Sequence, residues 1–217
     1  MKLLKKEIRL AASPLSFFFL AAVCLTFVPG YPILLGAFFI TLGIFYSFQT
    51  MRENGDIRYS LLLPVSKKDI VKSKYLFCVS IELSGFALMT VFTLIRMCFL
   101  SDAAVYTSNA LMGANFTFLG FVLLIFGLFN AVFVGGFFKT AYYFGKPFIL
   151  YIVVSLLVIA AAETLPHLPG CASFGALGFA PFVPQGCVFA AGIAAFVLLT
   201  LFSERASERR FEQIDLM

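Results

Sequence analysis

Long, continuously apolar stretches alternate with short polar connections along the 217-residue chain. A helix needs about 20 predominantly apolar residues to cross a hydrocarbon core ~30 Å thick. Six stretches approach this length, over residues 13–27, 33–48, 75–100, 114–138, 147–162 and 186–202. Membrane strands would show alternating hydrophobicity, which these stretches lack. The pattern therefore predicts an all-α integral membrane protein with six transmembrane helices in a single transmembrane domain over 1–217.

The composition supports a lipid environment. Hydrophobic residues make up 61% of the chain and charged residues only 12%, whereas a soluble domain carries about 25% charged residues. The 29 Phe residues are too many for a soluble core of this size to bury. We therefore expect the lipid bilayer to surround the chain, with no separate soluble domain.

The basic residues predict the orientation. In a six-span arrangement, fifteen of the 16 Lys and Arg residues fall on one side, which the positive-inside rule places in the cytoplasm together with both termini. The remaining one, Arg96, lies near the outer end of the third span, from which its side chain can extend outward. The net charge of +5 thus reflects topology and gives no reason to expect nucleic acid as a partner.

The first twelve residues form a predicted interfacial helix. Lys2, Lys5, Lys6 and Arg9 fall within one arc of about 100° on a helical wheel, with Glu7 as an acidic exception. Such a helix lies on the inner leaflet and is held by anionic head groups. The alternative is a simple positively charged anchor. The cytoplasmic tail is expected over 203–217.

The long cytoplasmic connection, residues 49–74, carries the clearest local signals. Asn54-Gly55 predicts a turn, and Asp56 is expected to cap a short helix over 57–63 that ends before Pro64. Ser66 and Asp69 have the spacing of a capping box, which predicts a second helix running on into the third span. Three consecutive leucines, 61–63, either form an exposed docking surface or fold back against the bilayer or the amino-terminal helix.

The outer connection over 163–185 is rich in Pro and Gly, yet residues 174–183 are apolar and uncharged. They are too few to cross the bilayer, so we expect a re-entrant loop, with a loop packed on the helix ends as the alternative. Cys171 and Cys187 lie on or near this side, where they either form a disulfide or remain free thiols.

Catalytic and nucleotide-binding motifs are missing from the sequence. There is no GxxxxGK[ST], HExxH or GxSxG, and the single histidine and the absence of CxxC argue against a metal site. We therefore expect neither enzymatic activity nor a cofactor bound by this chain. Polar residues inside predicted spans are functional candidates, which makes Glu82 and Asn130 candidate translocation-path residues; Asn130 is also expected to bond between helices.

Residues 53–75, ENGDIRYSLLLPVSKKDIVKSKY, resemble the cytoplasmic loop of bacterial ABC-2 type transporter permeases. The resemblance implies a permease in the bacterial inner or plasma membrane, working with a second permease chain, identical or paralogous, and with a cassette ATPase that binds the ATP and Mg. Permeases of this size are similar to exporters of small amphipathic peptides, such as the phenol-soluble modulin exporter. A hydrophobic or amphipathic cargo is therefore expected.

The resemblance also implies that the short helix is a coupling helix seated on the ATPase. The residues expected to couple to the ATPase are Glu53, Asp56, Ile57, Arg58, Tyr59, Leu61, Leu62, Leu63, Lys67 and Lys68. The alternative function is an ATPase-independent membrane protein, such as an immunity or assembly-scaffold protein.

The topology can be tested by cysteine labelling. In a cysteine-free background, single cysteines placed within 101–113 or 163–185 should react with a membrane-impermeant maleimide added to intact cells. Labelling of these loops only after the membrane is opened would contradict the six-span arrangement.

Overall fold

A computed structural model describes residues 7–8, 13–62, 64–140 and 143–214, and in this part of the chain the regular elements are all helical. The elements are α2 (Pro14–Phe18), η2 (Phe19–Phe27), α3 (Leu35–Glu53), α4 (Asp56–Leu61), α5 (Lys67–Phe99), α6 (Ala104–Thr107), α7 (Phe116–Leu128), the π-helical η3 (Phe129–Val134), α8 (Gly135–Thr140), α9 (Gly145–Thr164), η4 (Leu165–His167), η5 (Ala172–Phe174) and α10 (Phe182–Glu212). The interfacial helix predicted over 1–12 lies outside the described residues except for residues 7 and 8.

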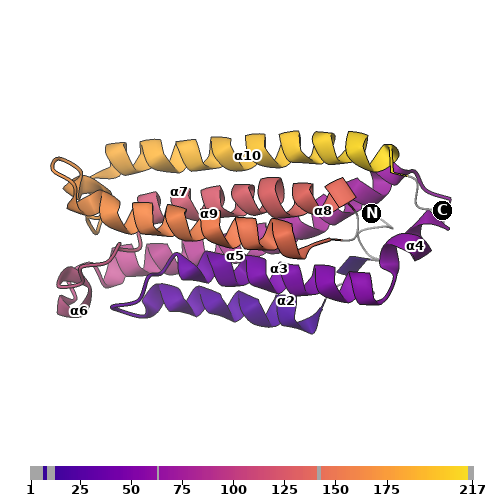
Figure 1. Ribbon diagram of the computed structural model, residues 1–217. Coiled ribbons are helices and arrows are strands. Elements are labelled where there is room, and N and C mark those ends of the chain that lie inside the picture. Colours follow the sequence, from indigo (N-terminus) through magenta and orange to yellow (C-terminus); the bar gives the residue numbers. More distant parts are fainter. Residues whose placement is uncertain (1–6, 9–12, 63, 141–142, 215–217) are drawn as a thin grey trace.

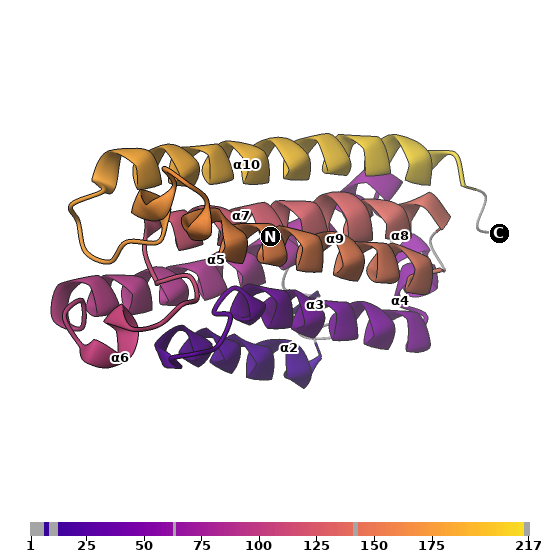
Figure 2. The same ribbon diagram turned by 60° about the vertical axis from the view of Figure 1, so that its left-hand side comes forward.

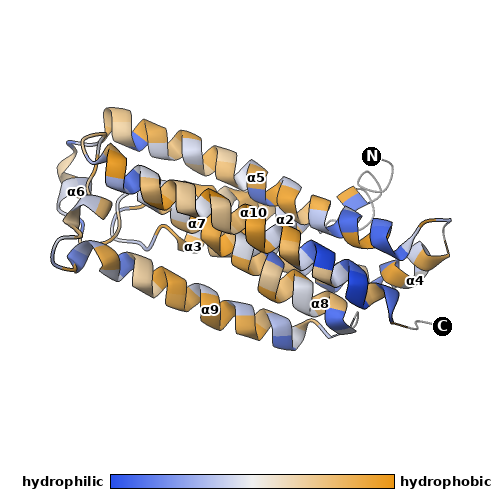
Figure 3. Cartoon of the chain, turned by 90° about the horizontal axis from the view of Figure 1, so that it is seen from above, coloured by the Kyte–Doolittle hydropathy of each residue, from blue (hydrophilic) through white to orange (hydrophobic). Residues whose placement is uncertain are grey.

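The long helices run side by side in an elongated bundle (Figures 1 and 2). The short helix α4 and the carboxyl end of α10 lie at one end of the bundle, and α6 and the connection between α9 and α10 lie at the other. Hydrophobic residues dominate the middle of the bundle, and hydrophilic residues gather around the end that holds α4 (Figure 3). This distribution matches a bilayer around the middle of the helices.

All six predicted apolar stretches are helical, which confirms an all-α membrane protein. Among the described residues four helices are long and apolar enough to cross a membrane: Lys67–Phe99, Phe116–Thr140, Gly145–His167 and Phe182–Glu212. They contain the third to sixth predicted spans. The first stretch forms a shorter apolar helix, Pro14–Phe27, and α3 ends in polar residues. Crossing by these two segments stays a prediction.

The first two helices are joined by buried hydroxyl groups. The Ser16 hydroxyl in α2 donates to the carbonyl of Gly43 in α3 over 2.5 Å and lies 2.6 Å from the hydroxyl of Ser47. The backbone N–H of Ser13, the residue that caps α2, also donates to the Ser47 hydroxyl. Hydroxyl groups in an apolar medium gain by bonding across helices, so α2 and α3 pair as a hairpin.

Glycines allow α7 and α10 to approach closely. A Cβ built on Gly120 of α7 would lie 2.7 Å from the carbonyl oxygen of Val188, and one on Gly192 of α10 would meet the backbone of Gly120. Further along, a Cβ on Gly127 would lie 3.0 Å from the Cα of Phe196. Small residues at helix contacts are the usual means of bringing two backbones together in a membrane.

Aromatic rings fill the core between α3, η3 and α9. The rings of Phe45 and Phe148 stack with centroids 3.7 Å apart, and Phe133 contacts both of them edge-on. Phe129 meets Tyr151 edge-on at 5.1 Å. A substantial share of the phenylalanines therefore packs inside the bundle, where such pairs add to the energy of simple burial.

Polar contacts close the end of the bundle that holds α6. The Arg96 side chain is buried and does not extend outward: it donates to the carbonyl of Thr26 and lies 4.1 Å over the ring of Tyr106. The amide of Asn115 donates to the carbonyls of Phe174 and Ala176. These two bonds from Asn115 hold the connection over 163–185 against the start of α7, as expected for a loop packed on the helix ends. How deeply that connection enters a bilayer stays a prediction.

The five cysteines are free thiols in the structure, Cys171 and Cys187 included. This corresponds to the second of the two expectations for that pair.

The close contact of α7 and α10 can be tested with two glycines of the same helix. Gly192→Ala places a methyl group against the backbone of Gly120 and should cost about 1–3 kcal/mol of stability, the usual range for overpacking. Gly186→Ala meets open space and should cause no loss. Thermal unfolding in detergent measures both, and equal midpoints would contradict the close approach of the two helices at Gly192.

Candidate functional site: the short helix α4 and the buried polar residues behind it

The turn before α4 forms as predicted. Gly55 adopts a left-handed conformation with φ of 63° and occupies the position before the first helical residue, a conformation that glycine takes at no steric cost. The expectation that Asp56 caps the helix is wrong, because Asp56 is the first helical residue and its carboxylate turns toward α5. The helix ends at Leu61, two residues earlier than expected.

The next helix begins at the predicted capping box. The Ser66 hydroxyl accepts from the Asp69 backbone N–H at 3.1 Å, and the Asp69 carboxylate accepts from the Ser66 backbone N–H at 3.4 Å. From there α5 continues without interruption for 33 residues, about 50 Å at 1.5 Å per residue. It connects the end of the bundle that holds α4 directly to the end that holds α6 (Figure 1).

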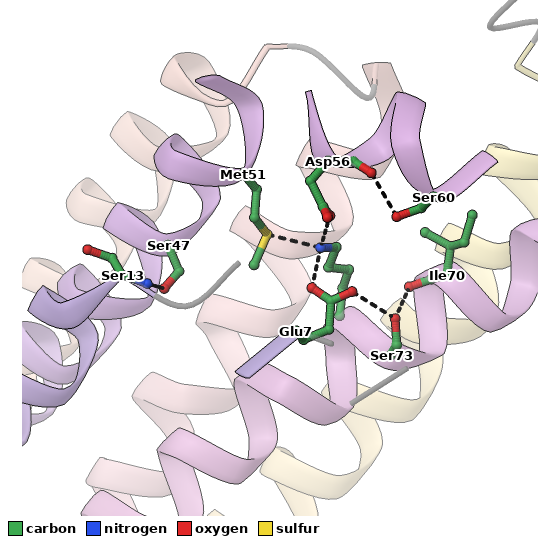
Figure 4. Close-up of polar contacts among 9 residues, drawn as sticks. Glu7, Ser13, Ser47, Met51, Asp56, Ser60, Ile70 and Ser73 are labelled. Carbon is green, nitrogen blue, oxygen red and sulfur yellow. Dashed lines mark hydrogen bonds and ion pairs between the residues drawn. The ribbon is translucent and has the colours of Figure 1, made fainter. Parts of the chain in front are cut away.

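A buried lysine joins α4 to α5 (Figure 4). Lys74 lies in the third turn of α5, is fully buried, and places its ammonium between the carboxylates of Glu7 and Asp56. Its Nζ also lies 3.2 Å from the sulfur of Met51 in α3, and the Ser73 hydroxyl donates to Glu7. Four segments of the chain therefore meet at one ammonium group.

The sequence alone did not reveal this cluster. Lys74 counted only as one of the cytoplasmic charges, and Glu7 as an exception on a basic helix face. The sequence does contain one signal, which is Glu7 itself. A single acid among four basic residues is best explained by a partner elsewhere in the chain.

The predicted coupling residues divide into an inner and an outer set. Asp56 is buried, and Ile57 and Leu61 pack partly buried against the hydrophobic core. Tyr59 and Leu62 face outward with 54% and 85% of their surfaces exposed. Leu61 therefore packs against the core and Leu62 is exposed, and docking through the leucine cluster stays a prediction. Leu63 and the side chain of Arg58 lie outside what the structure describes.

The three remaining candidates lie beside these residues. Glu53, at the end of α3, is exposed and accepts a hydrogen bond from Gln49 one turn earlier. Lys67 donates to the carbonyl of Ile214 at 2.8 Å, and Lys68 lies 3.2 Å from the carboxylate of Glu212. The start of α5 is thereby tied to the end of α10.

Deeper in the bundle the two candidate translocation-path residues meet. The amide of Asn130, in η3, donates to the Glu82 carboxylate of α5 at 2.8 Å and to the Thr200 hydroxyl of α10 at 3.1 Å. All three residues are buried, and one oxygen of Glu82 and the amide oxygen of Asn130 have no hydrogen-bond partner among the residues that the structure describes. Asn130 therefore bonds between helices as predicted, with α5 on one side and α10 on the other.

A row of hydroxyl groups extends this cluster along α10. The Tyr75 hydroxyl lies 2.7 Å from that of Ser203 and 2.9 Å from that of Ser207, and Ser203 donates to the backbone carbonyl of Asn130. Sequence reasoning missed these residues, since single hydroxyls are common in membrane helices. The π-helical geometry of η3, often found at functional sites, occurs where Asn130 meets Ser203.

A groove of about 280 Å³ between α5 and α10 lies next to the hydroxyl row. It is largely apolar, with one lysine and one glutamate, and Tyr75 and Thr200 contribute to both the groove and the buried cluster. The lining residues are Lys72, Tyr75, Leu76, Val79, Phe196, Val197, Thr200, Leu201 and Glu204.

The sequence matches a family model described as ABC-2 family transporter protein over residues 2–211, nearly the whole chain. The chain belongs to the ABC-2 transporter family. Searches of curated proteins and of solved structures gave no match. Members of this family form the membrane component of a transporter and are not themselves the ATPase. Among the described residues, no three His, Cys, Asp or Glu side chains gather where a metal ion would bind.

The contribution of the buried lysine can be measured by replacing it with an apolar residue of similar length. Lys74→Met removes the buried ammonium that contacts the carboxylates of Glu7 and Asp56 and should cost about 3–5 kcal/mol, the usual range for removing one partner of a buried ionic contact. Lys72→Met is the control, because Lys72 is exposed and lies 3.7 Å from Glu208, a surface pair worth about 0–1 kcal/mol. Thermal unfolding in detergent compares them. Equal losses would show that Lys74 does not hold the cluster.

Proposed function

We propose that this chain is the permease subunit of an ATP-binding cassette exporter and that α4 is its coupling helix. The observation that carries the proposal is the Glu7–Lys74–Asp56 cluster, because it joins an exposed cytoplasmic helix to the start of a long helix. A force applied to α4 therefore acts on α5 through buried ionic contacts. Contacts between flexible exposed side chains would transmit such a force less well.

The outward face of α4 suits a protein partner. Tyr59 lies on α4 and Leu62 directly follows its last residue, and both side chains are exposed while Ile57 and Leu61 pack against the core. Tyrosine is enriched among the residues that dominate interface energies, and the exposed leucine beside it adds apolar surface. A cassette ATPase subunit, carrying the ATP and Mg, is the proposed partner.

Motion of α5 reaches the interior polar cluster. Glu82 lies on the same unbroken helix as Lys74, eight residues or about 12 Å further along. Its partner Asn130 belongs to the π-helical segment, where a small shift in helical register changes which groups meet. We propose that ATP-driven movement of α4 alters the Glu82–Asn130–Thr200 contacts and the adjacent groove.

The groove between α5 and α10 supports a hydrophobic or amphipathic cargo. Its walls are mostly apolar, and Lys72 and Glu204 supply charges. Small amphipathic peptides combine both properties and are the proposed cargo class. A second permease chain, identical or paralogous, would complete the pathway in the bacterial plasma membrane, with both termini in the cytoplasm.

Co-purification tests the coupling helix. A tagged permease expressed with the cassette ATPase of its own operon should retain that ATPase, and the double variant Tyr59→Ser, Leu62→Ser should lower the retained amount at least tenfold. Leu61 is left unchanged because it packs against the core.

The matched control is Leu168→Ser, which removes an exposed leucine, 53% accessible, from the opposite end of the bundle. It should retain the ATPase fully. Full retention by the Tyr59, Leu62 variant would contradict the coupling assignment, and failure of the unmodified chain to bind any cassette ATPase would favour the immunity or scaffold alternative.

A further inference from the structure

A second groove lies between α8 and α9 and plays no part in the proposed function. It has a volume of about 640 Å³ and is formed where the two helices approach at the cytoplasmic end predicted from the charges. Gly136 lets them approach, because a Cβ there would lie 2.7 Å from Cβ of Pro147. The lining residues are Val132, Gly136, Lys139, Thr140, Tyr143, Lys146, Pro147 and Leu150.

Two lysines give this groove its charge. Lys139 and Lys146 are exposed side chains that line the same concavity, and within the described part of the chain neither has an acidic partner. In contrast, Lys68, Lys72 and Lys74 all pair with carboxylates. Two like charges on one groove repel each other, so the groove favours an anionic occupant.

The remaining walls are apolar and continue onto the face of α9 that the bundle leaves uncovered. Leu150 is 56% exposed, and Val153 and Leu157 further along α9 are also exposed. The backbone N–H of Tyr143 donates to the Thr140 hydroxyl at 3.2 Å, and this bond fixes two residues of the groove wall relative to each other. Positive charge thus sits at the cytoplasmic end of the groove and apolar surface extends from it toward the bilayer centre.

We propose that this groove, here called the Lys139–Lys146 groove, binds an anionic phospholipid of the cytoplasmic leaflet. The phosphate-bearing head group contacts the two ammonium groups, and an acyl chain lies against Val132 and Leu150. A phospholipid matches this arrangement, because its anionic head group lies at one end and its apolar acyl chains follow. Basic pockets between helices on the cytoplasmic side are suited to such head groups. A second copy of this chain fits less well, because it would bring further lysines toward the first two.

Quenching of tryptophan fluorescence by brominated lipids tests this proposal, since the chain contains no tryptophan. A Leu150→Trp variant is reconstituted in vesicles of phosphatidylcholine and brominated phosphatidylglycerol, and in the reverse pair. The quenching gives the binding constant of the anionic lipid relative to the neutral one. We expect a ratio of about five or more, because each lysine near anionic lipid contributes a factor of about five.

Two controls separate a site from general attraction to a charged surface. Leu157→Trp places the probe on the same face of α9, seven residues or about 10.5 Å further from the lysines, and should give a ratio near one. In the Leu150→Trp background, Lys139→Gln with Lys146→Gln should lower the ratio to near one. Lys68→Gln with Lys72→Gln removes the same charge elsewhere and should leave it unchanged.

Each other result would overturn the proposal. A ratio near one at position 150 means that the groove does not select anionic lipid. Equal loss in the two double variants means that only the overall charge acts. Absence of quenching by either lipid means that another protein surface, such as a second copy of the chain, covers the groove.

Discussion

Inside a bilayer a polar group has no water to bond with, and the interior of this protein is organised by that constraint. Backbone groups are satisfied within helices, and side chains such as Ser16, Asn130 and Ser203 bond across helices. The same constraint makes close backbone contact useful, since van der Waals packing replaces the hydrophobic effect as a source of stability. Gly120 and Gly192 provide such a contact between α7 and α10.

The Lys74 cluster applies the same constraint to charged groups. A buried ammonium is costly without a partner, and here two carboxylates from distant segments share one charge. A simple pair would have joined two segments, whereas this arrangement joins the amino-terminal segment, α4 and α5. These contacts join the segments at the end of the bundle that holds α4, which is the property that the proposed coupling helix requires.

The two grooves differ in what their walls offer. The groove between α5 and α10 lies beside buried hydroxyl groups, and its lysine faces acidic residues of α10, as the contact of Lys72 with Glu208 shows. The Lys139–Lys146 groove keeps its lysines without acids and opens along the exposed side of α9. We therefore propose different roles for similar residue types, cargo passage in the first groove and lipid contact in the second.

The sequence by itself determined the elements. Continuous apolar runs specify helices, and Asn54-Gly55 and the Ser66–Asp69 capping box specify where α4 and α5 begin. The loop motif indicates the ABC-2 family. All of these signals depend only on neighbouring residues. The tertiary structure decided which side chains meet. How helices far apart in the chain pack decides that Lys74 meets Glu7, that Glu82 meets Asn130, and that Leu62 is exposed but Leu61 is not. The apolar pattern is too uniform to encode which helix faces pack together.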